Sequence, residues 1–263
     1  MSGAYEKVMA SRAKGRPTGT NYINAIFTDF IELHGDRRFG EDTAIIGGLA
    51  FLKDIPVTVI AMEKGNSTRE KVFRNFGAPN PEGYRKSLRL MKQAEKFHRP
   101  VICFIDTAGA FCGIGAEERG QGQAIAENLM EMIALKIPII SIFIGEGGSG
   151  GALALAVANE VWMLENAMYS VISPEGCASI LWKDSKKVKD AAECLKLTAD
   201  DLKELNVIEE LIAEPKKDFM PLYNYLQSEL WKKIRKYQEI SGEAIAQKRY
   251  ERFRSFGVYN ENM

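Results

Sequence analysis

Short runs of consecutive apolar residues recur along the chain and predict buried β-strands. The clearest runs cover residues 57–62 (VTVIAM), 100–106 (PVICFID) and 138–144 (PIISIFI), and shorter ones cover 160–164 and 169–173. Strands that are apolar on both faces are typical of parallel sheets, because helices cover both sides of such sheets. The pattern therefore predicts an α/β protein with a largely parallel sheet.

The segments around these runs place apolar residues at helical spacing. Residues 21–34 predict one helix, and a second helix is expected from Pro81, because proline favours the first turn of a helix. Further helices are predicted up to about Leu135 and over residues 177–182, 188–195 and 198–205. Residues 218–254 predict a long amphipathic C-terminal helix. Residues 1–17 are polar and are expected to form a loose lead-in.

The composition fits a folded globular protein and excludes several classes of function. Of the 263 residues, 46% are hydrophobic, and 35 Lys and Arg balance 35 Asp and Glu. A net charge of zero argues against a nucleic-acid-binding protein, which needs an excess of basic residues. The longest apolar runs are too short to span a bilayer, and the N-terminus lacks the pattern of a signal peptide. We therefore expect a cytoplasmic protein without a membrane partner.

The four cysteines (Cys103, Cys112, Cys177 and Cys194) lie far apart in the sequence. Their spacing matches neither a zinc site nor a disulfide framework, so we expect no metal on this chain.

Two glycine-rich segments follow the two strongest predicted strands. The strand at 100–106 leads into DTAGAFCGIGAEERGQG, and the strand at 138–144 leads into GEGGSGG. Ten of the 23 glycines fall between Gly109 and Gly151. Glycine lets the backbone approach a ligand closely. One such loop is explained by a tight turn, but two at equivalent strand ends favour a ligand-binding cradle.

The segment GEGGSGG allows three interpretations. As Gly145-x-Gly147-x-x-Gly150 it matches a dinucleotide-binding fingerprint. The next predicted strand begins near Glu160, which leaves too little chain for the usual helical crossover between parallel neighbours. As Gly147-x-Ser149-x-Gly151 it matches a nucleophile elbow, but a hydrolase of that class needs a histidine after the serine.

Both histidines, His34 and His98, precede Ser149, so that order of catalytic residues is impossible. A Ser149 hydrolase that uses Lys183 as its base stays open as an unfavoured alternative. In the third interpretation the backbone itself is catalytic. Gly150 and Gly151 lie where a helix is expected to begin, so their amides have no intrahelical acceptor and form an oxyanion hole.

A concentration of basic residues is the other candidate feature. It consists of Lys64, Arg69, Lys71, Arg74, Arg85, Lys86 and Arg89. A solvated surface and a site for phosphates or for an acidic carrier protein are both consistent with it. His34 and His98 are expected to be structural or solvent-facing, and Asp106 is expected to end a buried strand.

Several long strings in the chain resemble the alpha-subunit family of the acetyl-CoA carboxylase carboxyltransferase. They include ELHGDRRFGEDTAIIGGLA, IDTAGAFCGIGAEERGQGQAIAENL, IGEGGSGGALALAVANEV and YSVISPEGCASILWKD, and the likeness extends from about Arg16 to Arg254. The resemblance implies a crotonase-like (ClpP/crotonase) fold, a spiral of β-β-α units with flanking helices. It also implies that residues 1–263 form a single carboxyltransferase domain.

The same resemblance implies an activity and partners. The family transfers a carboxyl group from carboxybiotin to acetyl-CoA and gives malonyl-CoA for fatty acid synthesis. The implied partners are a zinc-ribbon-containing beta subunit in an α2β2 assembly, biotin carboxylase and the biotin carboxyl carrier protein that holds the biotin. A subunit of a biotin-dependent acyl-CoA decarboxylase is the alternative, because it has the same fold.

The site residues implied by the family agree with the backbone interpretation. The alpha subunit's oxyanion hole matches Gly150 and Gly151, and Gly147, Gly148, Gly109, Ala110 and Phe111 are expected to bind substrate. The chain departs from the family at three places. Ala108 stands where the family usually has Pro, Phe111-Cys112 where it has Tyr-Pro, and Glu63-Lys64-Gly65-Asn66 where it has Gln-Lys-Gly-Arg.

Overall fold

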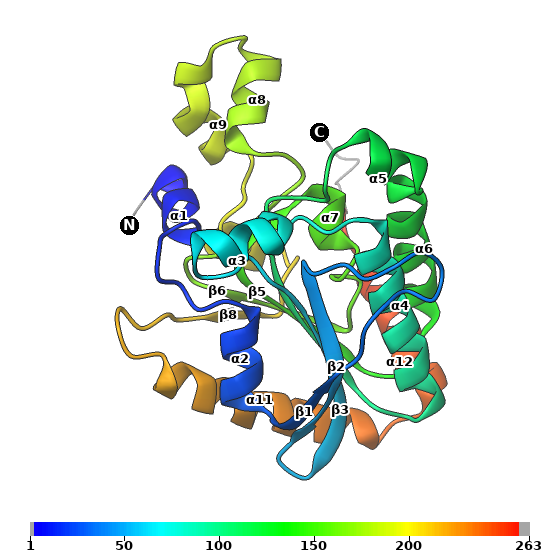
Figure 1. The fold of residues 1–263 in the computed structure, drawn as a ribbon. Helices are drawn as coiled ribbons and strands as arrows, with labels where there is room; N and C mark the ends of the chain where they lie inside the picture. Colours follow the sequence, from blue (N-terminus) through cyan, green and yellow to red (C-terminus); the bar gives the residue numbers. More distant parts are fainter. Residues whose placement is uncertain (1–2, 258–263) are drawn as a thin grey trace.

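A computed structural model describes residues 3–257, which form one eight-stranded sheet covered by helices (Figure 1). The sheet order is β1-β2-β3-β4-β5-β6-β8, and β7 pairs with the end of β5. The strands are β1 (Thr28–Glu32), β2 (Ile45–Leu52), β3 (Ile55–Met62), β4 (Val101–Thr107), β5 (Ile139–Gly148), β6 (Glu160–Leu164), β7 (Met168–Ser170) and β8 (Glu210–Ile212).

Most of the sheet is parallel. Every pairing from β3 through β4, β5 and β6 to β8 is parallel, whereas β1 with β2 and β2 with β3 are antiparallel pairs. Every residue of β4 and β5 is buried, which explains why these strands have continuous apolar runs. The predicted α/β class with a largely parallel sheet is confirmed.

Two groups of helices cover the sheet. Helices α4 (Pro81–Lys96), α6 (Gln121–Ala134) and α12 (Gly242–Arg254) stack together at one side, and α2 (Gly19–Ile26) and α11 (Met220–Gln238) lie against the other (Figure 1). Tyr22 of α2 stacks on Phe104 of β4, with ring centroids 5.3 Å apart. Four further helices are short: α3 (Thr68–Phe73), α5 (Ile114–Glu118), α7 (Ser149–Leu153) and α10 (Ala199–Glu204).

A helical lobe projects from the body of the molecule. It comprises α8 (Pro174–Leu181) and α9 (Val188–Cys194), at the top of Figure 1. Helix α1 (Ala4–Ser11) joins the lobe to the sheet, and the Ala4 amide donates to Glu193 Oε1 at 2.7 Å. The expected loose lead-in over residues 1–17 is therefore wrong over α1. Polar composition hid this helix, because Lys7 is buried and donates to the carbonyl oxygen of Glu165.

The predicted helix over 21–34 is also wrong in its second half. Helix α2 ends at Ile26, and residues 28–32 form the edge strand β1. Strand β2 beside it carries two glycines, and a Cβ atom on Gly48 would overlap the backbone of Ile31. The lack of a side chain lets β1 lie close to β2, and this long-range pairing overrides the helical spacing.

The single helix predicted over 218–254 is two helices. Helix α11 ends at Gln238, and α12 begins at Gly242, where Ser241 Oγ accepts a hydrogen bond from the Ala244 amide at 3.2 Å. A serine cap of this kind starts a new helix, so the chain turns and α12 packs against α6. Among the described residues, none of the helices combines the length and apolar character needed to cross a membrane.

Candidate functional site

The two glycine-rich segments meet at the C-terminal ends of β4 and β5. Thr107 pairs with Gly147, and the loop over residues 108–113 lies directly against the start of α7. A Cβ atom on Gly148 would overlap the carbonyl group of Ala108, and one on Gly151 would overlap the amide of Ala110. These glycines are therefore needed for the two segments to touch.

The second segment differs from the expected loop in its first half. Strand β5 continues through Gly148, so that GEGG is strand and α7 begins at Ser149. Gly150 and Gly151 occupy the second and third positions of α7, where amide groups have no intrahelical acceptor. The structure thus places both residues at a helix start, and their role as an oxyanion hole stays a prediction.

Ser149 has the strained backbone of a nucleophile elbow but lacks its partners. Its φ is +52°, and its side chain is exposed. Among the hydrogen bonds of residues 3–257, none joins Ser149 Oγ to a basic side chain. Both His34 and His98 are exposed, as expected, and Lys183 follows α8 on the projecting lobe. The geometry gives the hydrolase interpretation no base.

A mostly apolar cavity of about 520 Å³ opens beside α7. Gly150 and Ser149 form part of its wall, and β7, α10 and α12 supply much of the rest. Tyr169 lines it and stacks on Phe143, with ring centroids 4.3 Å apart. Burial raises the pKa of the Tyr169 hydroxyl to about 12, so Tyr169 is neutral near pH 7.

The other predicted substrate-binding residues fall into two groups. Gly147 and Gly148 are buried within β5 and pack against protein atoms. Gly109, Ala110 and Phe111 lie on the partly exposed loop. A Cβ atom on Gly109 would meet no atom within 4 Å, so this loop has open space beside it. Substrate binding by all five residues stays a prediction.

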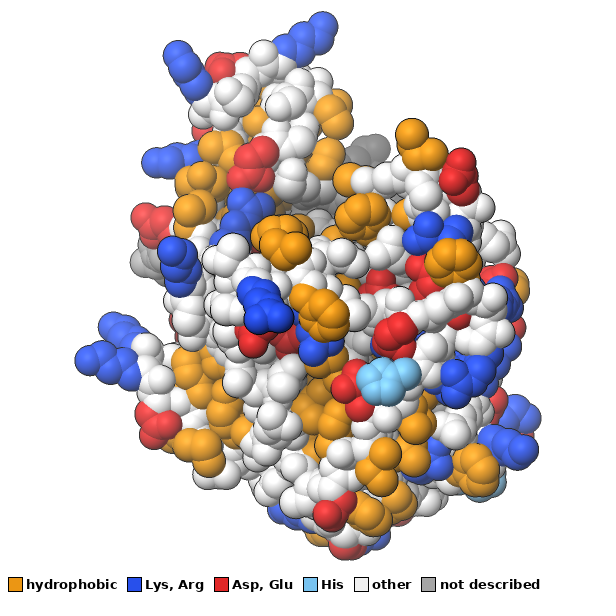
Figure 2. All heavy atoms as spheres, in the orientation of Figure 1, with side chains coloured by type: hydrophobic (Ala, Val, Ile, Leu, Met, Phe, Trp, Pro, Cys, Tyr) orange, Lys and Arg blue, Asp and Glu red, His pale blue; other side chains and the backbone are white. Residues whose placement is uncertain are grey.

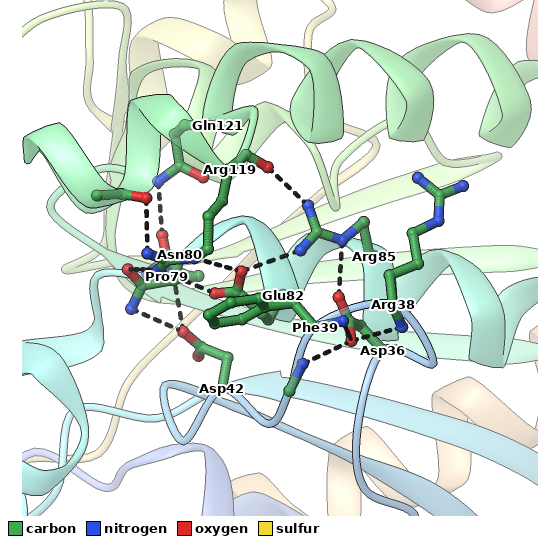
Figure 3. A network of polar contacts seen from close by, with 12 residues as sticks. Asp36, Arg38, Phe39, Asp42, Pro79, Asn80, Glu82, Arg85, Arg119 and Gln121 are labelled. Atoms are coloured by element: carbon green, nitrogen blue, oxygen red, sulfur yellow. Dashed lines mark hydrogen bonds and ion pairs between the residues drawn. The ribbon is translucent and has the colours of Figure 1, made fainter.

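A polar network holds this loop in place (Figure 3). Gln121 donates to the carbonyl oxygens of Phe111 and Pro79, at 2.8 and 2.9 Å, and the Phe111 amide donates to Pro79. The Glu82 carboxylate is buried between the guanidinium groups of Arg85 and Arg119, 2.9 and 2.8 Å away. Through Gln121 and Pro79 the loop over residues 108–113 is tied to the start of α6 and to the segment before α4, which fixes its position.

A cluster of charged side chains, which we call the Lys64 cluster, lies at the ends of β4 and β5, where both glycine-rich segments begin. It comprises Lys64, Asp106 and Glu146, and Lys64 Nζ is 2.6 Å from Asp106 Oδ1 and 2.7 Å from Glu146 Oε2. Burial opposes the charge of Lys64, but the two carboxylates outweigh it and raise the pKa of the ammonium group. Burial likewise raises the pKa of Glu146, but Lys64 and Arg12 outweigh it and lower the pKa.

The sequence alone does not predict the Lys64 cluster. Glu146 is a single polar residue within the glycine-rich GEGGSGG, and Asp106 ends an apolar run, so neither has a local signal that marks a charge cluster. Lys64 was grouped with the other basic residues nearby. The structure removes Arg85 and Lys86 from that group, because they pair internally with Asp36, Glu82 and Glu41.

Comparisons with known proteins agree on one family. A family model described as "Acetyl co-enzyme A carboxylase carboxyltransferase-like" matches residues 3–257. A relative from Ruminiclostridium cellulolyticum, named acetyl-coenzyme A carboxylase carboxyl transferase subunit alpha, is 64% identical and covers 98% of this chain and 99% of its own. A relative from Natranaerobius thermophilus, named subunits beta/alpha, is 57% identical over 98% of this chain and 43% of its own.

Solved structures show the same fold at low sequence identity. The transcarboxylase 12S core has a TM-score of 0.68 at 17% identity, over 84% of this chain and 42% of that one. The beta subunit of geranyl-CoA carboxylase from P. aeruginosa has a TM-score of 0.64 at 14% identity, over 94% of this chain and 46% of that one. This chain therefore spans less than half of each of those proteins. Their shared crotonase-like architecture confirms the predicted fold.

Proposed function

Because the chain belongs to the alpha-subunit family of the acetyl-CoA carboxylase carboxyltransferase, we propose that its α7 turn supplies half of a carboxyltransferase active site. The protein acts as the alpha subunit of an enzyme that forms malonyl-CoA from acetyl-CoA and carboxybiotin. Gly150 and Gly151 provide its oxyanion hole. The observation that supports this assignment is the position of both residues at the start of α7, where Gly150 lines an apolar cavity.

The second substrate is carboxybiotin on its carrier protein, and the reaction moves one carboxyl group. When bound, biotin supplies a nitrogen–carbon bond that breaks, an oxygen that takes up negative charge, and a nitrogen that accepts the proton of the acetyl methyl group. The new bond joins the carboxyl carbon to the acetyl methyl carbon. Charge on oxygen therefore develops twice, once on the biotin ring and once on the thioester.

The chain's own residues suit the biotin half of this reaction. The amides of Gly150 and Gly151 have no intrahelical acceptor, so they suit hydrogen bonds to an oxygen that takes up negative charge. The cavity beside them has about 520 Å³ and apolar walls, which suits a compact bicyclic ring. Its low polarity strengthens each hydrogen bond inside it. Such a donor, when lost, typically costs about 3 kcal/mol of transition-state stabilisation.

The other half of the site belongs to a beta subunit in an α2β2 assembly. Large apolar side chains are exposed on α5 and around α8: Ile114 of α5 is 81% exposed, Val171 before α8 is 75% exposed, and Ile180 of α8 is 68% exposed. Figure 2 shows apolar side chains around the hollow between these elements. Exposed apolar groups that gather around a site are typical of an interface. Biotin carboxylase and the biotin carboxyl carrier protein complete the set of partners.

Formation of malonyl-CoA tests this function directly. The chain alone and the chain co-expressed with a beta-type subunit are each given acetyl-CoA and carboxybiotin. We expect product only from the co-expressed pair, because each subunit holds one of the two oxyanion holes. Product from the chain alone would overturn the divided site. A stable complex that forms no product would overturn the assignment of acetyl-CoA as substrate.

A further inference from the structure

The Lys64 cluster is built into the fold at the point where both glycine-rich segments begin. Lys64 follows β3, Asp106 is near the end of β4, and Glu146 is in the last part of β5. The side chains of all three are mostly buried, with exposed fractions of 18%, 10% and 11%. The Glu146 amide also donates to Asp106 Oδ1 at 2.8 Å. One ammonium group therefore joins three neighbouring strands.

Two glycines leave the space that this cluster occupies. A Cβ atom on Gly145 would overlap the carboxylate of Asp106. A Cβ atom on Gly77, whose φ is +77°, would lie 2.5 Å from Lys64 Cγ. Side chains at either position would displace the ion pairs. The lack of side chains at Gly145 and Gly77 therefore leaves room for Lys64 and Asp106 to lie in contact.

The positions of the two carboxylates relate the cluster to the site. Asp106 lies four residues before Ala110, and Glu146 lies four residues before Gly150. Ala110 and α7 touch each other through Gly151. The two glycine-rich segments thus begin at the Lys64 cluster, and they contact each other again at the candidate oxyanion hole. A change in the separation of Asp106 and Glu146 will change the separation of the segments.

We propose that Lys64 is a positioning residue for the carboxyl-transfer reaction. Its ammonium group holds Asp106 and Glu146 together, and through them it sets the distance between the loop over residues 108–113 and the start of α7. Without this charge two buried carboxylates lie near one another and repel, because like charges in a poorly solvated site interact strongly. This inference rests on the proposed function.

The same cluster extends to the projecting lobe. Arg12 Nε is 2.7 Å from Glu146 Oε1, and Arg12 Nη1 is 2.7 Å from Glu175 Oε1 at the start of α8. Glu146 thus has a second cation, which remains when Lys64 is replaced. Asp106 then lies beside Glu146 without Lys64, and Asp106→Asn removes this second carboxylate.

The test measures carboxyl transfer by the assembled alpha and beta subunits with Lys64→Met, Lys64→Arg and the double variant Lys64→Met/Asp106→Asn. We expect Lys64→Met to lower kcat on the order of 100-fold, the effect of misplacing a catalytic group by about 1 Å, with KM for acetyl-CoA nearly unchanged. Lys64→Arg and the double variant should each recover part of kcat, because the first restores the positive charge and the second removes the repulsion.

Lys86→Met is the matched control. Lys86 is another buried lysine, which donates to Glu41 and to the carbonyl oxygen of Asp42, away from the glycine-rich segments. Its loss should lower the melting temperature but leave kcat of the folded protein within a few-fold. A kcat for Lys64→Met equal to that of Lys86→Met, or no recovery in the double variant, would overturn the role of Lys64. An inactive wild-type assembly would instead overturn the proposed function.

Discussion

At the scale of single residues, the α7 turn depends on the absence of side chains. Gly150 and Gly151 are adjacent, but their surroundings differ. A Cβ atom on Gly150 would make an ordinary contact with Ile125 at 3.7 Å, whereas one on Gly151 would overlap the Ala110 amide and lie 2.9 Å from the Tyr84 hydroxyl. Replacing either glycine by alanine keeps the backbone amide and adds only a methyl group. These two variants therefore test the shape of the site without removing a hydrogen-bond donor.

We expect Gly151→Ala to reduce carboxyl transfer on the order of 100-fold, because the added methyl group pushes the loop over residues 108–113 away from α7. Gly150→Ala should reduce it much less. Steady-state rates of both variants, assembled with the beta subunit, measure the difference. Equal losses in the two variants would contradict the view that contact between the two segments sets the geometry of the site.

At the scale of elements, local signals predicted the buried strands and failed where distant partners decide the structure. Strands β4 and β5 are buried throughout and begin with apolar runs, and Pro81 starts α4 as expected. By contrast, β1 was predicted as helix, since only its pairing with β2 makes it a strand. The meeting of the two glycine-rich segments was predictable, because parallel strands end at one edge. The Lys64 cluster was not, since its three members are far apart in the sequence.

Asp36, in the connection between β1 and β2, is expected to make the stability of the fold depend on pH. Asp36 Oδ1 accepts hydrogen bonds from the amides of Arg38, Phe39 and Gly40, and Oδ2 accepts one from Arg85 Nε at 2.7 Å. Burial raises the pKa of Asp36, but these donors outweigh it and lower the pKa from 3.8 to about 2. Asp36 therefore stabilises the fold above about pH 4, and this contribution is lost as pH falls toward 2.

We expect Asp36→Asn to lower the free energy of unfolding by about 2 kcal/mol at pH 7. The difference from wild type should shrink as pH falls from 4 toward 2. Denaturant unfolding at a series of pH values measures it, with Asp200→Asn, on the exposed side of α10, as the control. A difference that is independent of pH would show that the charge of Asp36 contributes nothing.

At the scale of the whole molecule, one buried arginine joins the C-terminal helix to the core. Arg249 of α12 is fully buried and donates to the carbonyl oxygens of Met132, Leu135 and Ile137 at 2.8, 2.6 and 2.6 Å. Two of these carbonyls lie at the C-terminal end of α6, where helices leave acceptors unpaired. Burial lowers the pKa of Arg249 to about 10, so the side chain stays charged near pH 7.

Arg249→Met should lower the free energy of unfolding by about 3 kcal/mol, because it leaves several buried acceptors without a donor. Thermal unfolding measures the effect, and Arg254→Met, at the exposed end of the same helix, is the control. Since α12 also lines the cavity beside α7, the variant should weaken binding of the biotin substrate as well. A melting temperature equal to that of wild type would contradict this role.

The hydrogen-bond donors proposed for this chain are backbone amides, and this limits how mutation during evolution can alter the site. Only a change to proline removes a backbone N–H, whereas almost any substitution deletes a serine hydroxyl or a histidine ring. Every other substitution reaches the chemistry by moving the backbone, either at neighbours such as Gly145 and Gly148 or through a side chain added at Gly151 itself. The same property limits drugs, because a reagent that modifies a reactive side chain finds no target at Gly150 or Gly151, and an inhibitor must compete by shape.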